Sequence, residues 1–242
     1  MNKKSSQSDV EPIGQYPKRE AREHAYDVTE ALVASIPGAG PALQKLLQVL
    51  GFDPYAKRER EFVERLAEVV TQLQNDDRLN VERLRDDPYF EGVVNDIREA
   101  YRTARTEAKK ELLMNVVANS ASGISLNDVL AGRFLSLLEQ YSQSHVQMLR
   151  LLQNPSANEN VNKLLQSTST GGLLNVIEAA FPNDEIPREA IEIVYADLEK
   201  DNLVEGRLHM TVSGSGLAQK RTTGVGDAFL QFIQPVGVSQ KS

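Results

Sequence analysis

Residues 87–120, DPYFEGVVNDIREAYRTARTEAKKELLMNVVANS, decide the fold class of this 242-residue chain. Asp87 suits a helix N-cap, and Pro88 suits the first helical position, where a missing amide hydrogen costs nothing. From there apolar residues return every three or four positions, the period of one helix face. These residues are Phe90, Val93, Ile97, Tyr101, Ala104, Ala108, Leu112 and Val116. The stretch therefore predicts one long amphipathic helix that reaches about Ser120.

Two further stretches have the same period. Residues 56–74 place Phe62, Leu66, Val69 and Leu73 on one face. After a break at Ser122-Gly123, we expect Ser125 to cap a third helix, interrupted near Ser142 and ended by Asn154-Pro155. Its apolar stripe is Leu130, Phe134, Leu137, Tyr141, Met148 and Leu152. Short connections between such helices predict an antiparallel helical bundle over residues 23–155 without a sheet. Its expected core includes Phe62, Leu66, Ile97, Tyr101, Phe134 and Leu138.

The predicted elements become shorter after Pro155. Helical patterns at 161–166, 173–181 and 187–200 are followed by alternation of period two from Leu203 to Val212. Because Gly214 and Gly216 suit a turn, we expect a two-stranded hairpin over residues 203–223 and a last helix through Phe229 and Ile233. This order predicts a small winged-helix-like α+β unit over residues 156–236 in a chain that is mainly α. Residues 1–22 and 237–242 are expected to be tails, the first because it lacks any apolar period.

Composition narrows the classes of function. The absence of cysteine excludes disulfides, thiolate metal sites and cysteine nucleophiles. A net charge of -7 makes the molecule as a whole repel nucleic acid and anionic lipid. The polar start lacks the apolar segment of a secretory signal, which predicts a cytoplasmic protein. His24, His145 and His209 do not have the spacing of a metal or catalytic motif, so we expect no catalytic, cofactor-binding or metal-ligating residues and no cofactor.

Three segments resemble a loosely defined group of uncharacterised bacterial α-helical proteins. They are residues 31–50 with the turn Ser35-Ile36-Pro37-Gly38-Ala39-Gly40-Pro41, the segment from Arg105 to Ser120, and the closing segment from Thr222 to Ile233. The resemblance covers most of the chain from about His24. It implies a helical body followed by a winged-helix-like unit, and it implies no activity or catalytic residue.

Two groups of basic residues are the candidate binding residues. Arg98, Arg102, Arg105 and Lys109 recur at steps of four, three and four, and one continuous helix would align them in a stripe that binds phosphates or an acidic partner. The alternative is that their stems follow the edge of the apolar face while Glu99, Glu107 and Glu111 balance the charge.

The second group, Arg207, Lys220 and Arg221, would lie on the expected wing as possible contacts. The helix before that wing is acidic, with seven acidic and two basic residues between Asp184 and Asp201. Duplex DNA is therefore not an expected partner.

Residues 31–50 are unusual because Lys45 is their only charged residue. The break from Pro37 to Pro41 leaves two pieces of about 15 Å each, too short for a hydrocarbon layer of about 30 Å. We therefore expect this hairpin to pack against the long helices. The sequence favours a non-enzymatic interaction or regulatory protein that acts through protein–protein contacts, with another protein or a second copy as partner. The alternatives are a membrane-active effector that releases residues 31–50 and a nucleic-acid-binding regulator.

Overall fold

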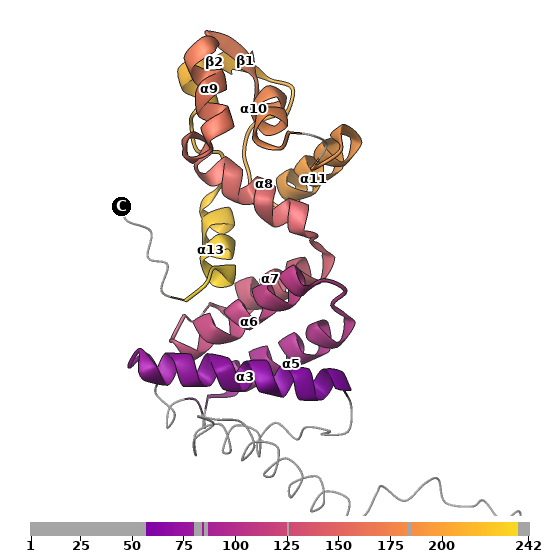
Figure 1. The fold of residues 1–242 in the computed structure, drawn as a ribbon, viewed down its shortest axis with the longest axis vertical. Coiled ribbons are helices and arrows are strands. Elements are labelled where there is room, and N and C mark those ends of the chain that lie inside the picture. The colour runs from indigo at the N-terminus through magenta and orange to yellow at the C-terminus, as the bar shows by residue number, and fades with distance from the viewer. Residues whose placement is uncertain (1–56, 80–83, 85–86, 125, 183–184, 237–242) are drawn as a thin grey trace, which may run out of the picture.

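The structure, a computed structural model, describes residues 57–79, 84, 87–124, 126–182 and 185–236 (Figure 1). This part of the chain is mainly helical and contains one small antiparallel sheet, which confirms the predicted fold class. The expected tails at 1–22 and 237–242 and the expected hairpin at 31–50 lie outside the described residues.

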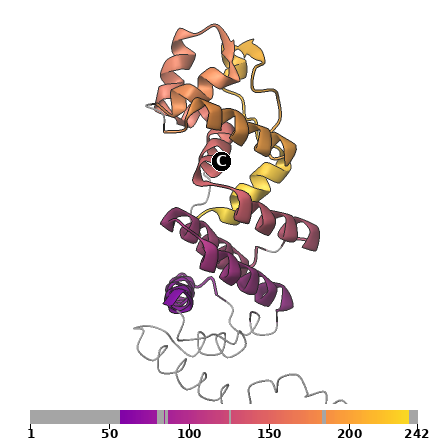
Figure 2. The ribbon, with the colours of Figure 1, turned by 90° about the vertical axis from the view of Figure 1, so that its right-hand side faces the viewer.

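Within the described residues, the helices that precede residue 141 form the lower part of the structure in Figure 1. They are α3 (Lys57–Asn75), α5 (Pro88–Thr103), α6 (Glu107–Ala121) and α7 (Asp128–Gln140). Figure 2, in which α3 is seen end-on, shows α3 below the pair α5 and α6. The six residues predicted for this core, from Phe62 to Leu138, are all buried. The three-and-four spacing therefore identified the correct face of these helices.

The prediction of one continuous helix from Asp87 to Ser120 is wrong, because the chain breaks between α5 and α6. Asp87 caps α5 as predicted, by accepting hydrogen bonds from the amides of Tyr89 and Phe90. Thr106 then caps a new helix through a hydrogen bond from the Lys109 amide, so α6 folds back against α5. The break shifts the apolar face: Leu113 is fully buried, whereas the predicted Leu112 is only half-buried.

The interruption predicted near Ser142 is confirmed, since α7 ends at Gln140 and α8 spans Gln143–Gln153. Asn127 caps α7 by accepting the Leu130 amide. The residue predicted for that role, Ser125, lies outside the described residues. Asn154-Pro155 ends α8 as predicted, and a short 3-10 helix, η1 (Pro155–Ala157), follows.

A smaller unit forms the upper end of the molecule. It contains α9 (Glu159–Ser167), β1 (Thr170–Gly172), α10 (Leu173–Ala180), α11 (Arg188–Lys200), β2 (Thr211–Ser213) and α12 (Gly214–Leu217). The predicted helix at 187–200 is thus confirmed as α11.

The hairpin predicted within residues 203–223 is wrong, because β2 pairs with β1, with Thr170 opposite Ser213 and Gly172 opposite Thr211. The two ends of the predicted hairpin meet only in an isolated bridge between Val204 and Thr222. The physical reason lies at Gly214, where Ser213 caps α12 and ends the strand. A Cβ atom on Gly214 would lie 2.7 Å from the Thr168 carbonyl oxygen, so glycine permits this close approach beside β1.

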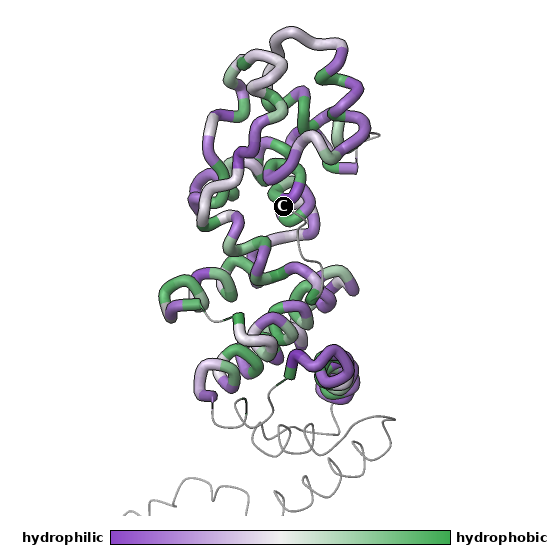
Figure 3. The backbone as a smooth tube through the Cα atoms, turned by 90° about the vertical axis from the view of Figure 1, so that its left-hand side faces the viewer, coloured by the Kyte–Doolittle hydropathy of each residue, from purple (hydrophilic) through white to green (hydrophobic). Residues whose placement is uncertain are grey.

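The last helix, α13 (Gly224–Ile233), forms where predicted but packs against α6 and α8, between the two halves (Figure 1). The Asn119 side chain of α6 donates to the carbonyl oxygens of Phe232, at 2.9 Å, and Gln234, at 2.8 Å. The Phe134 ring contacts the rings of Phe229 and Phe232. One core therefore joins the bundle to the smaller unit, and Figure 3 shows hydrophobic stretches at every level of the described chain.

Candidate interaction surface

The predicted basic stripe does not form, because the break at Ala104–Thr106 separates its four members. Arg98 makes an ion pair with the buried Glu59, and Arg102 pairs with Glu99 at 3.1 Å. Arg105 is exposed in the break. The Lys109 ammonium group donates to the Tyr141 carbonyl oxygen at 2.7 Å, and burial lowers its pKa. The alternative interpretation, in which neighbouring glutamates balance the charges, describes Arg102, whereas Arg98 is balanced by Glu59 of α3.

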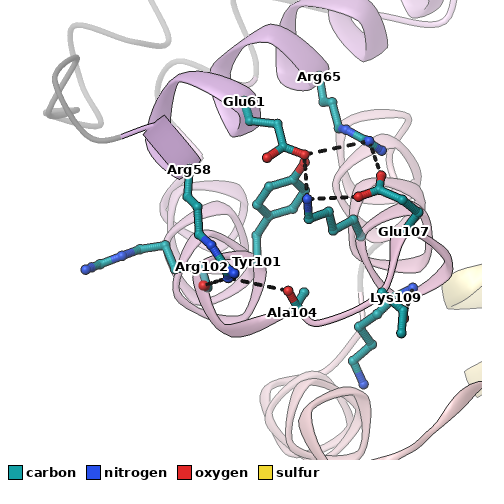
Figure 4. A network of polar contacts seen from close by, with 10 residues as sticks. Arg58, Glu61, Arg65, Tyr101, Arg102, Ala104, Glu107 and Lys109 are labelled. Carbon is teal, nitrogen blue, oxygen red and sulfur yellow. Dashed lines mark hydrogen bonds and ion pairs between the residues drawn. The ribbon is translucent and has the colours of Figure 1, made fainter.

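A network of charges around Glu61 joins α3, α5 and α6 (Figure 4). The Glu61 carboxylate accepts hydrogen bonds from Lys110, at 2.5 Å, and from the Tyr101 hydroxyl, at 3.1 Å. Arg65 and Lys110 both pair with Glu107. The hydrogen bond from Lys110 lowers the pKa of Glu61, and burial raises the pKa of Tyr101. Two cations and two carboxylates compensate one another here, so the network holds the helices together and leaves no net charge for a ligand.

Two of the three basic residues predicted for the wing have structural partners. Lys220 pairs with Asp227, and the Arg221 guanidinium donates to the Gly216 carbonyl oxygen at 2.7 Å. Although burial opposes it, hydrogen bonds from Lys220, Thr222 and Gln153 lower the pKa of Asp227. Arg207 is exposed and lines an open groove.

That groove, of about 550 Å³, runs along α11 and is the larger of two hollows described here. We call it the α11 groove. One wall consists of Glu192, Tyr195, Ala196 and Glu199 of α11, and the other consists of residues 207–210. The Tyr195 hydroxyl donates to the Gly206 carbonyl oxygen at 2.9 Å and so ties the two walls together.

The sequence of α11 explains why this face is open. Its apolar residues Ile191, Val194, Tyr195 and Leu198 are buried, which leaves the opposite side of the helix to solvent. On that side Ile193 is 63% exposed next to the exposed Glu189. The exposed Glu192 and Glu199 lie between this side and the buried face and line the groove. The second wall is shaped by a turn at Gly206, whose φ of +95° suits glycine. The groove therefore has two carboxylates on its α11 wall, Arg207 and His209 on the other wall, and the apolar side chains of Ala196, Leu208 and Met210 in its lining.

A smaller hollow of about 250 Å³ lies between α5, α6 and α7. Ile97, Ala100, Leu113 and Leu135 supply its apolar lining, and Asp96, Glu99 and Glu139 supply carboxylates. It resembles the α11 groove in chemistry but has less than half of its volume.

The histidines occupy separate environments. His145 is buried, with its Nδ1 atom 2.9 Å from the Ser142 hydroxyl and its Nε2 atom 3.4 Å from an Asp197 carboxylate oxygen. The chain of contacts from Ser142 through His145 to Asp197 resembles a hydrolytic triad. However, His145 Nδ1 also accepts a hydrogen bond from the Ser142 backbone amide at 3.1 Å and so caps α8. His209 is exposed at the α11 groove, 3.9 Å from Glu192. His24 lies outside the described residues.

Sequence reasoning missed the α11 groove and the His145 cluster. The acidic character of residues 184–201 was the only available signal for the first. A serine three residues before a histidine, at a point where a helix was expected to break, was the signal for the second. Asp197 and residues 207–210 could not be assigned to these sites because only the fold brings them there.

Comparison with known proteins found no matching family model, no similar curated protein and no similar solved structure. Within the described residues, no cluster of three or more His, Cys, Asp or Glu side chains has the arrangement of a metal site. None of the helices in that part of the chain combines the length and hydrophobicity needed to cross a bilayer.

Proposed function

We propose that this protein is a non-enzymatic interaction or regulatory protein of the cytoplasm that binds another protein through the α11 groove. The observation that carries the proposal is the groove itself, which is open, lies on the surface and combines the carboxylates of Glu192 and Glu199 with apolar side chains. Protein interfaces commonly have a small apolar centre surrounded by polar residues. Ala196, Leu208 and Met210 supply the apolar part of the groove lining.

The chemistry of the groove favours a basic partner segment. Two exposed glutamates, Glu192 and Glu199, line the groove against one arginine, Arg207, and charges of opposite sign on a partner would accelerate association and orient the complex. An aliphatic side chain on the same segment would contact Ala196 and Met210. The expected partner is therefore a segment with Lys or Arg on both sides of a Leu or Ile residue.

Two labelled helical peptides test this proposal. The basic probe carries one Leu per turn flanked by Lys and Arg, and the acidic probe carries Glu and Asp in their place. We expect the full chain to bind the basic probe, and the double substitution Glu192→Lys with Glu199→Lys to weaken binding strongly. The matched control is Glu64→Lys with Glu68→Lys, which changes the net charge equally on an exposed face of α3.

Equal loss in the two double variants would mean that the probe senses only net charge, and the proposed site would be wrong. A third variant, Met210→Gln, isolates the apolar contribution because it replaces an apolar side chain of the groove lining and leaves the charges unchanged. Loss of one buried aliphatic contact is worth about 1–3 kcal/mol, or roughly a 5- to 150-fold loss of affinity.

The charge of α11 also favours a protein partner over duplex DNA. The helix is acidic, so phosphates would repel it. Lys220 and Arg221, proposed as possible wing contacts, are engaged by Asp227 and Gly216. These contacts favour a protein partner over the nucleic-acid alternative. The membrane alternative depends on residues 31–50, and liposome leakage by the intact chain remains its test.

A further inference from the structure

The helix that forms one wall of the α11 groove is fastened to the rest of the protein by a buried histidine. On its side away from the groove, α11 packs against α8, and the Asp197 carboxylate faces His145 across that contact. At the end of α11, Asp201 accepts hydrogen bonds from the Tyr141 hydroxyl, at 2.7 Å, and from Arg133, at 2.6 Å. The Tyr141 ring stacks on the His145 ring at 4.5 Å.

The hydrogen bonds of His145 define its protonation state. Its Nδ1 atom accepts the backbone amide of Ser142, so Nδ1 carries no hydrogen and the neutral ring has its proton on Nε2, facing Asp197. This is the role that Glu or Gln plays at the third position of a capping box. A second proton, on Nδ1, would point at the Ser142 amide, and two donors cannot bond to each other. The ring must then leave the amide, and α8 loses part of its N-terminal cap.

The surrounding charges act in opposite directions. The groups that face His145 are Asp197 and Asp201 on α11, Lys109 on α6, and Arg133 on α7 through Asp201. The two carboxylates favour the protonated ring, whereas Lys109 disfavours it. Burial is the largest influence, and it lowers the pKa of His145 below the ordinary value. The folded protein therefore holds His145 neutral.

We propose that His145 is a pH-sensitive latch that holds α11 in the position that forms the α11 groove, and that its protonation weakens partner binding. This proposal rests on the proposed function of the groove. The direction of the pH effect follows from the linkage between proton binding and conformation, because the closed state binds a proton on His145 less readily than an open or unfolded state does. The latch is fully closed above about pH 6.5 and loosens as the pH falls toward the lowered pKa of His145. The equilibrium changes about tenfold for each unit by which closure lowers that pKa.

The test uses the full chain with His209→Gln as its background, because His209 lies in the groove and would add its own charge. His145→Gln is the decisive variant, since Gln accepts the Ser142 amide as His does but does not titrate. Affinity for the basic probe is measured from pH 7.5 to 5.5, where its Lys and Arg residues stay charged. We expect the background protein to lose affinity toward pH 5.5 and His145→Gln to keep a constant affinity. The same pH dependence in both proteins would overturn the latch.

A measurement without a partner separates failure of the latch from failure of the proposed function. Amide hydrogen exchange is followed in residues 143–146 and 191–201, together with the NMR titration of the His145 ring. We expect faster exchange in both segments as the ring becomes protonated, and constant exchange in His145→Gln. Asp197→Asn removes a charge that favours protonation, so it should move the transition to lower pH. If the basic probe fails to bind at any pH, the proposed function fails, and the exchange data alone decide the latch: unchanged exchange on protonation would overturn it.

Discussion

The close approach of α13 to the chain near Leu203 provides a sharp test of how the two halves are joined. Gly226 lies in the first turn of α13, and a Cβ atom placed on it would overlap the Leu203 carbonyl oxygen. That oxygen is held in place because it accepts the Thr223 amide at 3.0 Å. By contrast, a Cβ atom on Gly224, two residues earlier in the same helix, meets no atom within 4 Å. Gly226→Ala and Gly224→Ala are therefore a matched pair.

Both substitutions gain up to about 1 kcal/mol from helix propensity and reduced freedom of the unfolded chain, so this gain largely cancels in the comparison. Only Gly226→Ala forces the backbone apart, and overpacking of this kind costs about 1–3 kcal/mol. For a protein of this size, the difference corresponds to a Tm of Gly226→Ala that is lower by roughly 2–12 °C. Urea unfolding and calorimetry of the two variants measure it. Equal stability of the two proteins would mean that α13 does not dock against Leu203 as described.

Three further substitutions test separate parts of the structure. Phe134→Ala removes the ring that contacts Phe229 and Phe232, and it should lower the free energy of unfolding by about 3–5 kcal/mol in urea titrations, whereas Val129→Ala, at an 81% exposed position, should change it little. Glu61→Gln should flatten the loss of stability in acid: the lowered pKa of Glu61 makes it stabilising above the unfolded value near 4.5, and this contribution is lost as the pH falls through the folded-state pKa. An unchanged acid limb in thermal melts would contradict that role. Tyr195→Phe removes the hydrogen bond to Gly206 and should cost about 1 kcal/mol of stability while weakening binding of the basic probe. Loss of stability with unchanged probe binding would mean that this hydrogen bond does not shape the binding site.

The sequence was most informative where apolar residues recur at the helical period and no capping residue interrupts the helix. Phe62 and Leu66 on α3, and Phe134 and Leu138 on α7, were assigned to the core because burial of one face imposes the helical period. The continuous helix through Ala104 failed because the apolar residues continue in phase across the break. Thr106 competes with the helix there, since its side chain caps the amide of Lys109.

The pairing of the strands was not predictable from a local pattern. Alternation between Leu203 and Val212 indicates extended chain but does not specify the partner, and β1 contributes only three residues, two of them glycine. The α11 groove depends on the same long-range arrangement, because a turn at Gly206 brings residues 207–210 to α11. Its acidic wall was visible in the sequence, whereas its second wall was not.

The most direct test of the proposed interaction surface is an NMR titration of the isotope-labelled chain with the basic probe at pH 7.5. We expect saturable amide shift changes concentrated in residues 188–200 and 206–210, with loss of these changes in Glu192→Lys with Glu199→Lys and their retention in Glu64→Lys with Glu68→Lys. Shift changes confined to the hollow between α5 and α7, or spread evenly over all acidic faces, would contradict the assignment of the α11 groove as the binding site.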